Sequence, residues 1–429
     1  MALMFFWVLL IAMALGVPIV FALILAPMIG AVLADRAIFL SMMPQRIFSG
    51  INPFPVLAIP MFILAGEIMN RGGITLRLVG FANALVGHLR GGLAHVNIVS
   101  SMLFAGLSGS AVADTSALGS ILIPAMEKDG YTRRFAAAVT AASSVIGPII
   151  PPSIIMVVYA YIMNVSVGGL FAAGFVPGAM MGLGLMLVTA FLARRRNYPR
   201  TDRRATLGET GSAFKSAFLP LLTPVIILGG ILSGIFTPTE AAAAAVLYAL
   251  ALSLLVTRTL ALHELPTMLF RAGVAASTIL LVVGAATLFG WIASLSGVPG
   301  AATKLLLSIS DDPYVMLLVI NLLLLVVGMF FDAGPAILIL GPLIGPTMLQ
   351  LGVEPLHLAI IMCVNLTVGL ATPPVGLVLF VASTLTRLSV MEIARDMWPF
   401  LLVHVVVILL ITYVPALTLT LPRLLGLGG

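Results

Sequence analysis

The chain has 429 residues, of which 61% are hydrophobic and only 8% are charged. A soluble domain typically carries about 25% charged residues, so this composition excludes a soluble globular protein and indicates a polytopic protein embedded in the lipid bilayer. The net charge of +6 does not indicate binding to nucleic acid, because the basic residues lie mostly in short loops, where they set membrane topology. The one cysteine, Cys363, excludes an intrachain disulfide.

The N-terminal apolar run is long for one membrane helix and short for two. A crossing needs roughly 17 to 25 residues, and the turn-forming Gly16-Val17-Pro18 favours two short helices within the first 34 residues. The run has no basic segment before it and no small-residue cleavage site, so we expect an uncleaved membrane segment rather than a signal peptide. We assign 1–73 to N-terminal scaffold helices and 74–90, which has basic and apolar faces, to an amphipathic arm at the membrane interface.

Basic residues predict the orientation of the later spans. The strongest cluster, "ARRRNYPRTDRR", follows a span at about 168–193, and the positive-inside rule places this loop (194–213) in the cytoplasm. "KDGYTRR" (128–134) and "TRLSVMEIARD" near the end of the chain are expected on the same side. The acidic "SISDDPY" has no nearby base and is therefore expected outside.

Two apolar segments do not fit as simple crossings. Residues 91–127 are too long for one helix, both of their ends are assigned to the cytoplasm, and their centre is the polar "GLSGSAVADTSALGS". Residues 313–350 behave in the same way from outside, with "GMFFDAGPAILILGP" at their centre. We therefore predict two re-entrant helical hairpins. Each must lie within protein, because lipid cannot satisfy the backbone of an irregular tip.

Each hairpin is followed by an apolar span that is interrupted by adjacent prolines. The two interruptions read "SSVIGPIIPPSI" (143–154) and "NLTVGLATPPVG" (365–376). They correspond when Asp114 is aligned with Asp332 and four extra residues are allowed further on, which pairs Pro124 with Pro342, Gly130 with Gly352, Ser143 with Asn365, Gly147 with Gly369 and Pro151-Pro152 with Pro373-Pro374. Since one hairpin opens inward and the other outward, the copies form an inverted repeat, which is typical of secondary transporters.

The expected fold is thus an all-α polytopic membrane protein with inverted-topology repeats, two re-entrant hairpins and two broken helices. The repeats define two halves of a transport domain, 91–161 and 313–387. The remaining chain is assigned to scaffold helices (162–298, including the basic loop), a second amphipathic arm (299–312) and a C-terminal helix (388–429). Small-residue faces in "ILGGILSG" and "EAAAAAV" suit the close helix packing of a static scaffold.

The broken helices are the expected ion and substrate sites. Each break frees carbonyls that can bind a cation and begins a half-helix whose positive N-terminal end can face an anion. Neutral oxygen ligands suit a hard cation such as Na⁺. The predicted sodium ligands are Ser108, Gly109, Ser110, Asp114, Ser143, Ser144, Gly147, Asp332, Gly334, Asn365, Thr367, Gly369 and Thr372. The predicted substrate contacts are Ser108, Ser110, Pro151, Pro152, Thr372, Pro373 and Pro374.

Several polar residues have a structural interpretation as well. Asp114 and Asp332 either ligate Na⁺ or cap a hairpin helix, and the sequence does not favour one role. Thr237 and Glu240 have the spacing of a capping box, and Glu67 suits a solvated or salt-bridged position better than a proton relay. The five histidines show no metal-binding spacing, and "GLSGS" lacks a His/Asp set, so no enzyme activity is expected.

"GLSGSAVADTSALGSILIPAM", "SSVIGPIIPPSI", "GIFTPTEAAAAA" and "GLATPPVGLVLF" resemble the large membrane subunit of tripartite ATP-independent periplasmic (TRAP) transporters. The resemblance covers essentially the whole chain. It implies a bacterial inner-membrane importer, driven by a Na⁺ gradient, that moves an organic acid such as sialic acid or a C4-dicarboxylate by an elevator motion. It also implies two partners, a separate small four-helix membrane subunit and a periplasmic substrate-binding protein.

Two other classes of transport protein remain open at this point. A single-component Na⁺/carboxylate transporter would share the paired hairpins but would need no binding protein. A channel would need a continuous polar pore in place of two occluding hairpins. Transport by liposomes containing this chain alone would favour the first class, and currents far above carrier turnover would favour the second.

Overall fold

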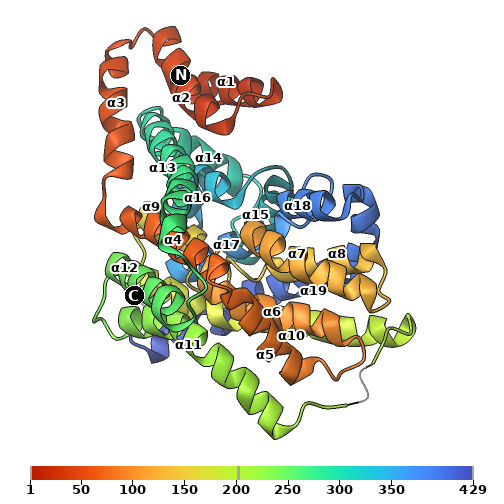
Figure 1. Cartoon of the computed structure of the whole chain (residues 1–429). Coiled ribbons are helices and arrows are strands. Elements are labelled where there is room, and N and C mark those ends of the chain that lie inside the picture. The colour runs from red at the N-terminus through yellow and green to blue at the C-terminus, as the bar shows by residue number, and fades with distance from the viewer. Residues whose placement is uncertain (1, 201–202, 428–429) are drawn as a thin grey trace.

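The computed structural model describes residues 2–200 and 203–427. Residues 201 and 202 of the predicted basic loop, and 428 and 429 of the predicted C-terminal helix, lie outside this part of the chain. The regular elements of the described residues are all helices (Figure 1). Eight continuous helical stretches, three of which join an α-helix to a short 3₁₀ or π turn, are long and apolar enough to cross a membrane, counting only described residues: Phe54–Arg71, Val167–Arg195, Leu207–Leu232, Pro238–Val256, Leu262–Leu295, Pro313–Phe330, Ala333–Gln350 and Val390–Tyr413.

The N-terminal run forms two helices, which confirms the favoured interpretation. Helix α1 (Ala2–Ala14) and helix α2 (Ile19–Leu33) are joined by a turn in which Gly16 has φ +79°. L-residues with a side chain rarely adopt this conformation. Helix α3 (Ile38–Ile51) follows, and α1–α3 project from one end of the molecule in Figure 1.

The next helices form a first packed group. A 3₁₀ turn, η1 (Phe54–Leu57), leads into α4 (Ala58–Arg71), and α4 packs against α12 and α13. The other members of the group and the short turns attached to them are α5 (Ile74–Val86), α11 (Leu207–Leu232), α12 (Pro238–Ala251), the π-helical η2 (Leu252–Val256), η3 (Leu262–Glu264) and α13 (Leu265–Leu295). The predicted capping box opens α12: Thr237 accepts a hydrogen bond from the Glu240 amide, and the Glu240 carboxylate accepts one from the Thr237 amide.

Each predicted hairpin is a pair of helices joined by two residues. The first pair is α6 (Gly92–Ser108) and α7 (Ala111–Lys128), and the second is α15 (Pro313–Phe330) and α16 (Ala333–Gln350). An amphipathic helix precedes each pair and packs on it. Helix α5 packs on α6, and helix α14 (Val298–Leu307) packs on α16. That each pair enters and leaves a membrane on one face stays a prediction.

Both predicted broken helices are interrupted where the prolines stand. Helix α8 (Arg133–Ser144) and helix α9 (Ile154–Met163) are separated by nine non-helical residues, 145–153. In the second copy, α17 (Pro355–Gly369) and α18 (Leu377–Thr386) are separated at 370–376. The peptide bonds Pro151-Pro152 and Pro373-Pro374 are both cis.

A second packed group contains the hairpins, the broken helices and the helix that follows each of them. Helix α10 (Val167–Arg195) packs mainly on α6, α19 and α20, and only lightly on α11. This differs from its predicted place among the scaffold helices, and repeat symmetry explains the difference, because α10 follows the first broken helix as α19 (Val390–Tyr413) follows the second. The C-terminal segment is two helices, since α20 (Ala416–Leu424) begins after Pro415.

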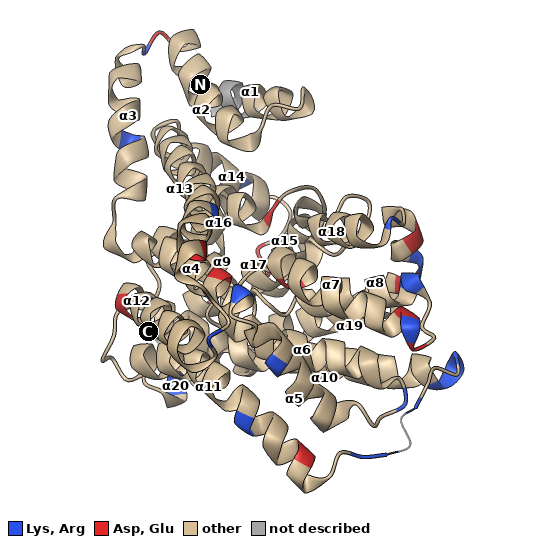
Figure 2. Cartoon of the chain, viewed as in Figure 1, with Lys and Arg blue, Asp and Glu red and all other residues tan. Residues whose placement is uncertain are grey.

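Three stretches that were predicted to be cytoplasmic lie together at one edge of the second group. Arg133 donates to the carbonyl of Thr386, and Arg196 forms a bidentate ion pair with Asp396 at 2.9 and 3.1 Å. Figure 2 shows the basic residues gathered at the ends of α8 and α10. The loops at 128–134, 194–200 and 386–396 therefore share one face of the molecule.

Candidate functional site

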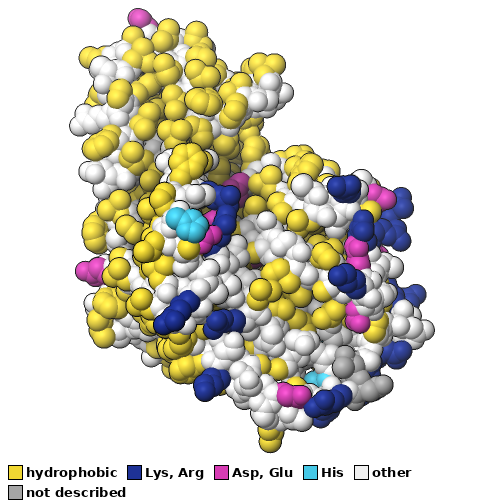
Figure 3. All heavy atoms as spheres, in the orientation of Figure 1, with side chains coloured by type: hydrophobic (Ala, Val, Ile, Leu, Met, Phe, Trp, Pro, Cys, Tyr) yellow, Lys and Arg dark blue, Asp and Glu magenta, His cyan; other side chains and the backbone are white. Residues whose placement is uncertain are grey.

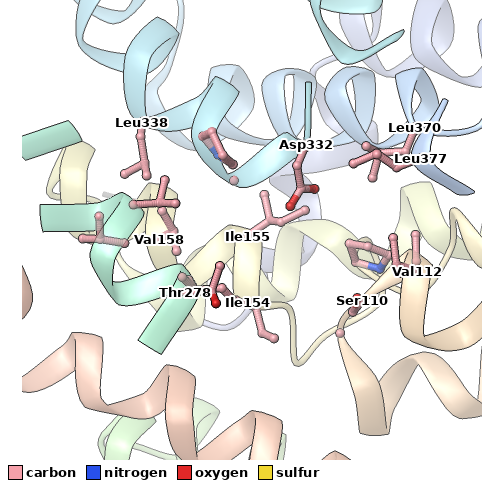
Figure 4. A pocket seen from close by; sticks show the side chains of 18 of the residues that line it. Ser110, Val112, Ile154, Ile155, Val158, Thr278, Asp332, Leu338, Leu370 and Leu377 are labelled. Carbon is pink, nitrogen blue, oxygen red and sulfur yellow. The ribbon is translucent and has the colours of Figure 1, made fainter. Parts of the chain in front are cut away.

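A cavity of about 510 Å³ lies where the hairpin tips meet (Figure 4). Four helices begin at its wall, which includes Ala111 of α7, Ile154 of α9, Gly334 of α16 and Leu377 of α18. The two hairpin tips contribute Ser110 and Asp332, whose side chains are labelled in Figure 4. Helix α13 closes one side with Thr278, Ile279, Val282 and Val283.

Ser110 and Asp332 occupy equivalent positions in the two hairpins. Ser110 is the N-cap of α7 and accepts from the Ala113 amide at 3.4 Å, while Asp332 is the N-cap of α16 and accepts from the Ala333 amide at 2.8 Å. Both helices have 18 residues. The capping role considered for Asp332 is therefore confirmed, whereas α7 is capped by Ser110 and not by Asp114.

This equivalence corrects the predicted repeat alignment. The shift from Ser110 to Asp332 also relates Ser143 to Asn365 and Gly147 to Gly369, so no four-residue insertion separates the copies. Pro124 then corresponds to Pro346, and Asp114 corresponds to Ala336 rather than to Asp332. The sequence alignment was wrong because it matched the two acids, although one lies in the first turn of its helix and the other precedes its helix.

Asp114 is fully buried beside the first break. One of its carboxylate oxygens, Oδ1, accepts a hydrogen bond from the Ser108 hydroxyl. The other, Oδ2, has no hydrogen-bond partner among the described residues. It lies so close to Gly147 that a Cβ there would be 2.2 Å from it and 3.1 Å from the Ser144 carbonyl oxygen. Because an unpaired buried carboxylate oxygen is costly, this position fits a bound cation.

A polar residue near the end of the first half of each broken helix is bonded to an asparagine of the hairpin. Ser143 donates to Asn97 Oδ1 at 3.2 Å and accepts from Ser101 at 2.9 Å. In the second copy, Asn365 donates to Asn321 Oδ1 at 2.7 Å. These contacts join α6 to α8 and α15 to α17.

Three further hydroxyls predicted as sodium ligands donate to the backbone carbonyl four residues earlier in the chain. Ser144 bonds the Thr140 carbonyl at 2.7 Å, Thr367 that of Cys363 at 2.6 Å, and Thr372 that of Val368 at 2.8 Å. A hydroxyl that donates its proton in this way keeps its lone pairs. All three therefore remain able to accept from a donor or to bind a cation.

The Pro-Pro segments support the hairpin tips and are not among the residues that line the central cavity. A Cβ at Gly109, whose φ is +59°, would lie 2.7 Å from the Pro152 carbonyl oxygen. In the second copy, the Gly376 amide donates to the Met329 carbonyl at 2.9 Å. Of the predicted substrate contacts, Ser110 lines this cavity and Ser108 lines a neighbouring one, whereas Thr372 is buried outside both.

The sequence reasoning missed Asn97, Asn321 and the α13 wall. Each asparagine is a single amide within a predicted membrane segment, in "LAHVNIVSSM" and "LLVINLLLL". A polar residue inside a membrane segment usually faces protein and has a partner, and this signal could have identified both asparagines. The α13 residues carry no such signal, because apolar side chains line a cavity and a lipid-facing surface alike.

Comparison with known proteins gives a consistent result. Residues 6–417 match the family model for the DctM component of the tripartite ATP-independent periplasmic transporters. The chain is 42% identical to the C4-dicarboxylate TRAP transporter large permease protein DctM of Pseudomonas aeruginosa, over 89% of this chain and 90% of that protein. It is 41% identical to the sialic acid TRAP transporter large permease protein SiaM of Vibrio cholerae, over 96% of both.

Among solved structures, the chain resembles the Alcanivorax borkumensis YdaH transporter. The TM-score is 0.62 at 15% identity, covering 100% of this chain and 99% of that one. At this identity the likeness supports the transporter fold alone, while the sequence matches span nearly the whole chain. The chain therefore belongs to the DctM component family of the tripartite ATP-independent periplasmic transporters, as a large membrane permease subunit.

Proposed function

We propose that this permease imports an organic acid by coupling its uptake to a Na⁺ gradient. The chain is a multi-pass membrane transport protein of the TRAP family and not an enzyme. The cargoes named for two of its relatives, sialic acid and C4-dicarboxylates, are both carboxylates. The helix N-termini at the central cavity support an anionic cargo. The buried Asp114 beside the first break supports the coupling to Na⁺.

The observation that carries the proposal is the meeting of four helix N-termini at one cavity. Helices α7, α9, α16 and α18 all begin there, and none of its described lining residues is basic. A helix N-terminus carries roughly half a positive charge together with free amides. Four of them favour a carboxylate without any arginine or lysine. Asp332 would then receive a hydroxyl or another donor of the substrate, because a second carboxylate there would be repelled.

Na⁺ binding is proposed where helices end rather than begin. Helices α6 and α8 end near Asp114, and helices α15 and α17 end where Gly328 and Gly369 approach closely. Helix C-termini carry partial negative charge, and unwound carbonyls coordinate Na⁺ in other transporters built from repeats. The unpaired oxygen of Asp114 supports a charged first site, and Ala336, its counterpart, leaves a second site with neutral oxygens alone.

We propose an elevator motion in which the second packed group moves as one body. This group contains α6–α10 and α15–α20, and its internal links include the Asn97–Ser143 bond and the Arg196–Asp396 ion pair. The static part would be α1–α5 with α11–α14, and α5 and α14 would brace the hairpins. The cavity lies between the two parts, since α13 forms one of its walls.

The proposed partners are a small membrane subunit and a periplasmic substrate-binding protein, in a bacterial inner membrane. The naming of the family as tripartite supports both partners. The same matches do not favour the single-component Na⁺/carboxylate transporter, whose relatives would not be components of such a system. The binding protein would do much of the substrate selection.

Cation replacement tests the coupling. The chain, reconstituted with its two partners, should take up succinate or N-acetylneuraminate only when Na⁺ is higher outside the vesicles. Replacing Na⁺ by K⁺ or choline should abolish uptake, because both ions are larger than the Na⁺ for which the sites are proposed. Undiminished uptake in K⁺ or choline would exclude Na⁺ coupling.

A further inference from the structure

A second cavity, of about 260 Å³, adjoins the central one on the side of the first hairpin. Its wall is formed by α4, by α13 and by the tip of the α6–α7 hairpin. The two cavities share Ser110, Ile154 and Ile279. A molecule that leaves the central cavity past Ser110 therefore passes the part of α4 that carries Glu67 and Asn70.

Glu67 belongs to a chain of four alternating charges. Its Oε1 lies 3.8 Å from Arg71 Nε on the same helix and 3.9 Å from Arg271 Nη1 on α13. Arg71 in turn lies 3.9 Å from Glu264 Oε1. Figure 3 shows acidic and basic side chains gathered in the hollow between the two parts of the molecule. The chain of charges thus connects α4, α13 and η3 beside the second cavity.

These ion pairs are loose and partly exposed. All three distances are close to 4 Å, which is beyond hydrogen-bonding length. The side chains of Arg71 and Arg271 are 38% and 57% exposed, and that of Glu67 is 26% exposed. Exposed pairs of this kind contribute only about 0.2–1 kcal/mol each, so another anion can replace Glu67 as the partner of either arginine.

We propose that Arg71 and Arg271 receive the substrate's carboxylate on its way out of the central cavity, and that Glu67 competes with it for them. The described lining residues of both cavities include no basic side chain, so these arginines supply the positive charge that the path itself lacks. Glu67 keeps them from retaining the anion. This role rests on the proposed function, because it requires an anionic cargo released on the side of Arg71.

The Glu67→Gln variant tests this role. The amide keeps the size of the side chain but no longer neutralises the arginines, so the anion should stay longer at the exit. In vesicles containing the complete complex, we expect turnover and KM for succinate or N-acetylneuraminate to fall together, by roughly three- to tenfold. In the purified complex, succinate should protect Arg71 and Arg271 from phenylglyoxal more strongly in E67Q than in the wild type.

Two further variants separate this role from simple loss of structure. Glu354→Gln removes a similarly exposed carboxylate that pairs with Arg423, away from both cavities, and it should stay within twofold of the wild type. E67Q/R271Q also removes Arg271, one of the two arginines that E67Q leaves without Glu67 as a partner. The anion should then be held less strongly at the exit, and turnover should rise again. An E67Q variant with wild-type turnover, or a double variant no faster than E67Q, would overturn the release role. A wild type without gradient-driven uptake would instead contradict the proposed function.

Discussion

A methyl group at Gly147 should weaken Na⁺ binding by displacing Asp114. A Cβ there would lie 2.2 Å from Asp114 Oδ2, whereas ordinary contact begins at 3.4 Å, so the oxygen must move by about 1.2 Å. The φ angle of Gly147 is not among the positive values in the chain, which means that alanine is compatible with the backbone. The effect of Gly147→Ala therefore comes mainly from the contact with Asp114, with a smaller contribution from the Ser144 carbonyl oxygen at 3.1 Å.

The displacement can be converted into an expected loss of affinity. If the oxygen contacts the cation at about 2.5 Å, as oxygens contact other hard cations, the move takes it to about 3.7 Å. At an effective dielectric constant of about 20, the attraction falls by about 2 kcal/mol. This corresponds to a roughly thirtyfold higher Na⁺ concentration for half-maximal effect.

Thermal unfolding of the purified protein measures this change directly. Na⁺ that binds the folded state raises Tm as its concentration increases, and the Na⁺ dependence of Tm should shift to higher concentration in Gly147→Ala. Gly229→Ala is a matched control, because nothing lies within 4 Å of a Cβ at that position. Once Asp114→Ala has removed the oxygen, adding Gly147→Ala should cost little more. Additive losses, or an unshifted Na⁺ dependence in Gly147→Ala, would refute the assignment of Asp114.

Two further predictions concern motion and stability. A disulfide between cysteines at Gly168 and Ile231, where the moving group meets α11 (Cβ to side-chain methyl 3.3 Å), should stop uptake. A disulfide between cysteines at Gly184 and Val403, both within the moving group, suits disulfide geometry because the Cβ atoms are 3.8 Å apart. This disulfide should leave uptake unchanged. Equal inhibition by the two disulfides would contradict the elevator motion. Thr237→Ala should lower the free energy of unfolding by about 1 kcal/mol through loss of the α12 cap without changing the Na⁺ dependence of uptake, and an altered Na⁺ dependence would indicate a role beyond capping.

Much of the fold follows from local features of the sequence. Composition determines the membrane class, because a chain with 8% charged residues cannot cover a soluble surface. Pro148 and Pro373 determine where α8 and α17 end, since each stands four residues after the last helical residue and lacks the amide that would continue the helix. Thr237 and Glu240 determine where α12 begins, through hydrogen bonds that span three residues. Each of these effects acts within one or two turns of chain, and for that reason it can be read without the tertiary structure.

The tertiary structure alone decided how the two repeats and their acids are related. Asp114 and Asp332 look equivalent in the sequence, yet one is buried against Gly147 and the other caps α16 at the cavity. The grouping of α10 with the hairpins and the bond between Asn97 and Ser143 join residues far apart in the chain. Apolar periodicity is the same on a face that packs on protein and on one that faces lipid, so only the packed structure distinguishes them.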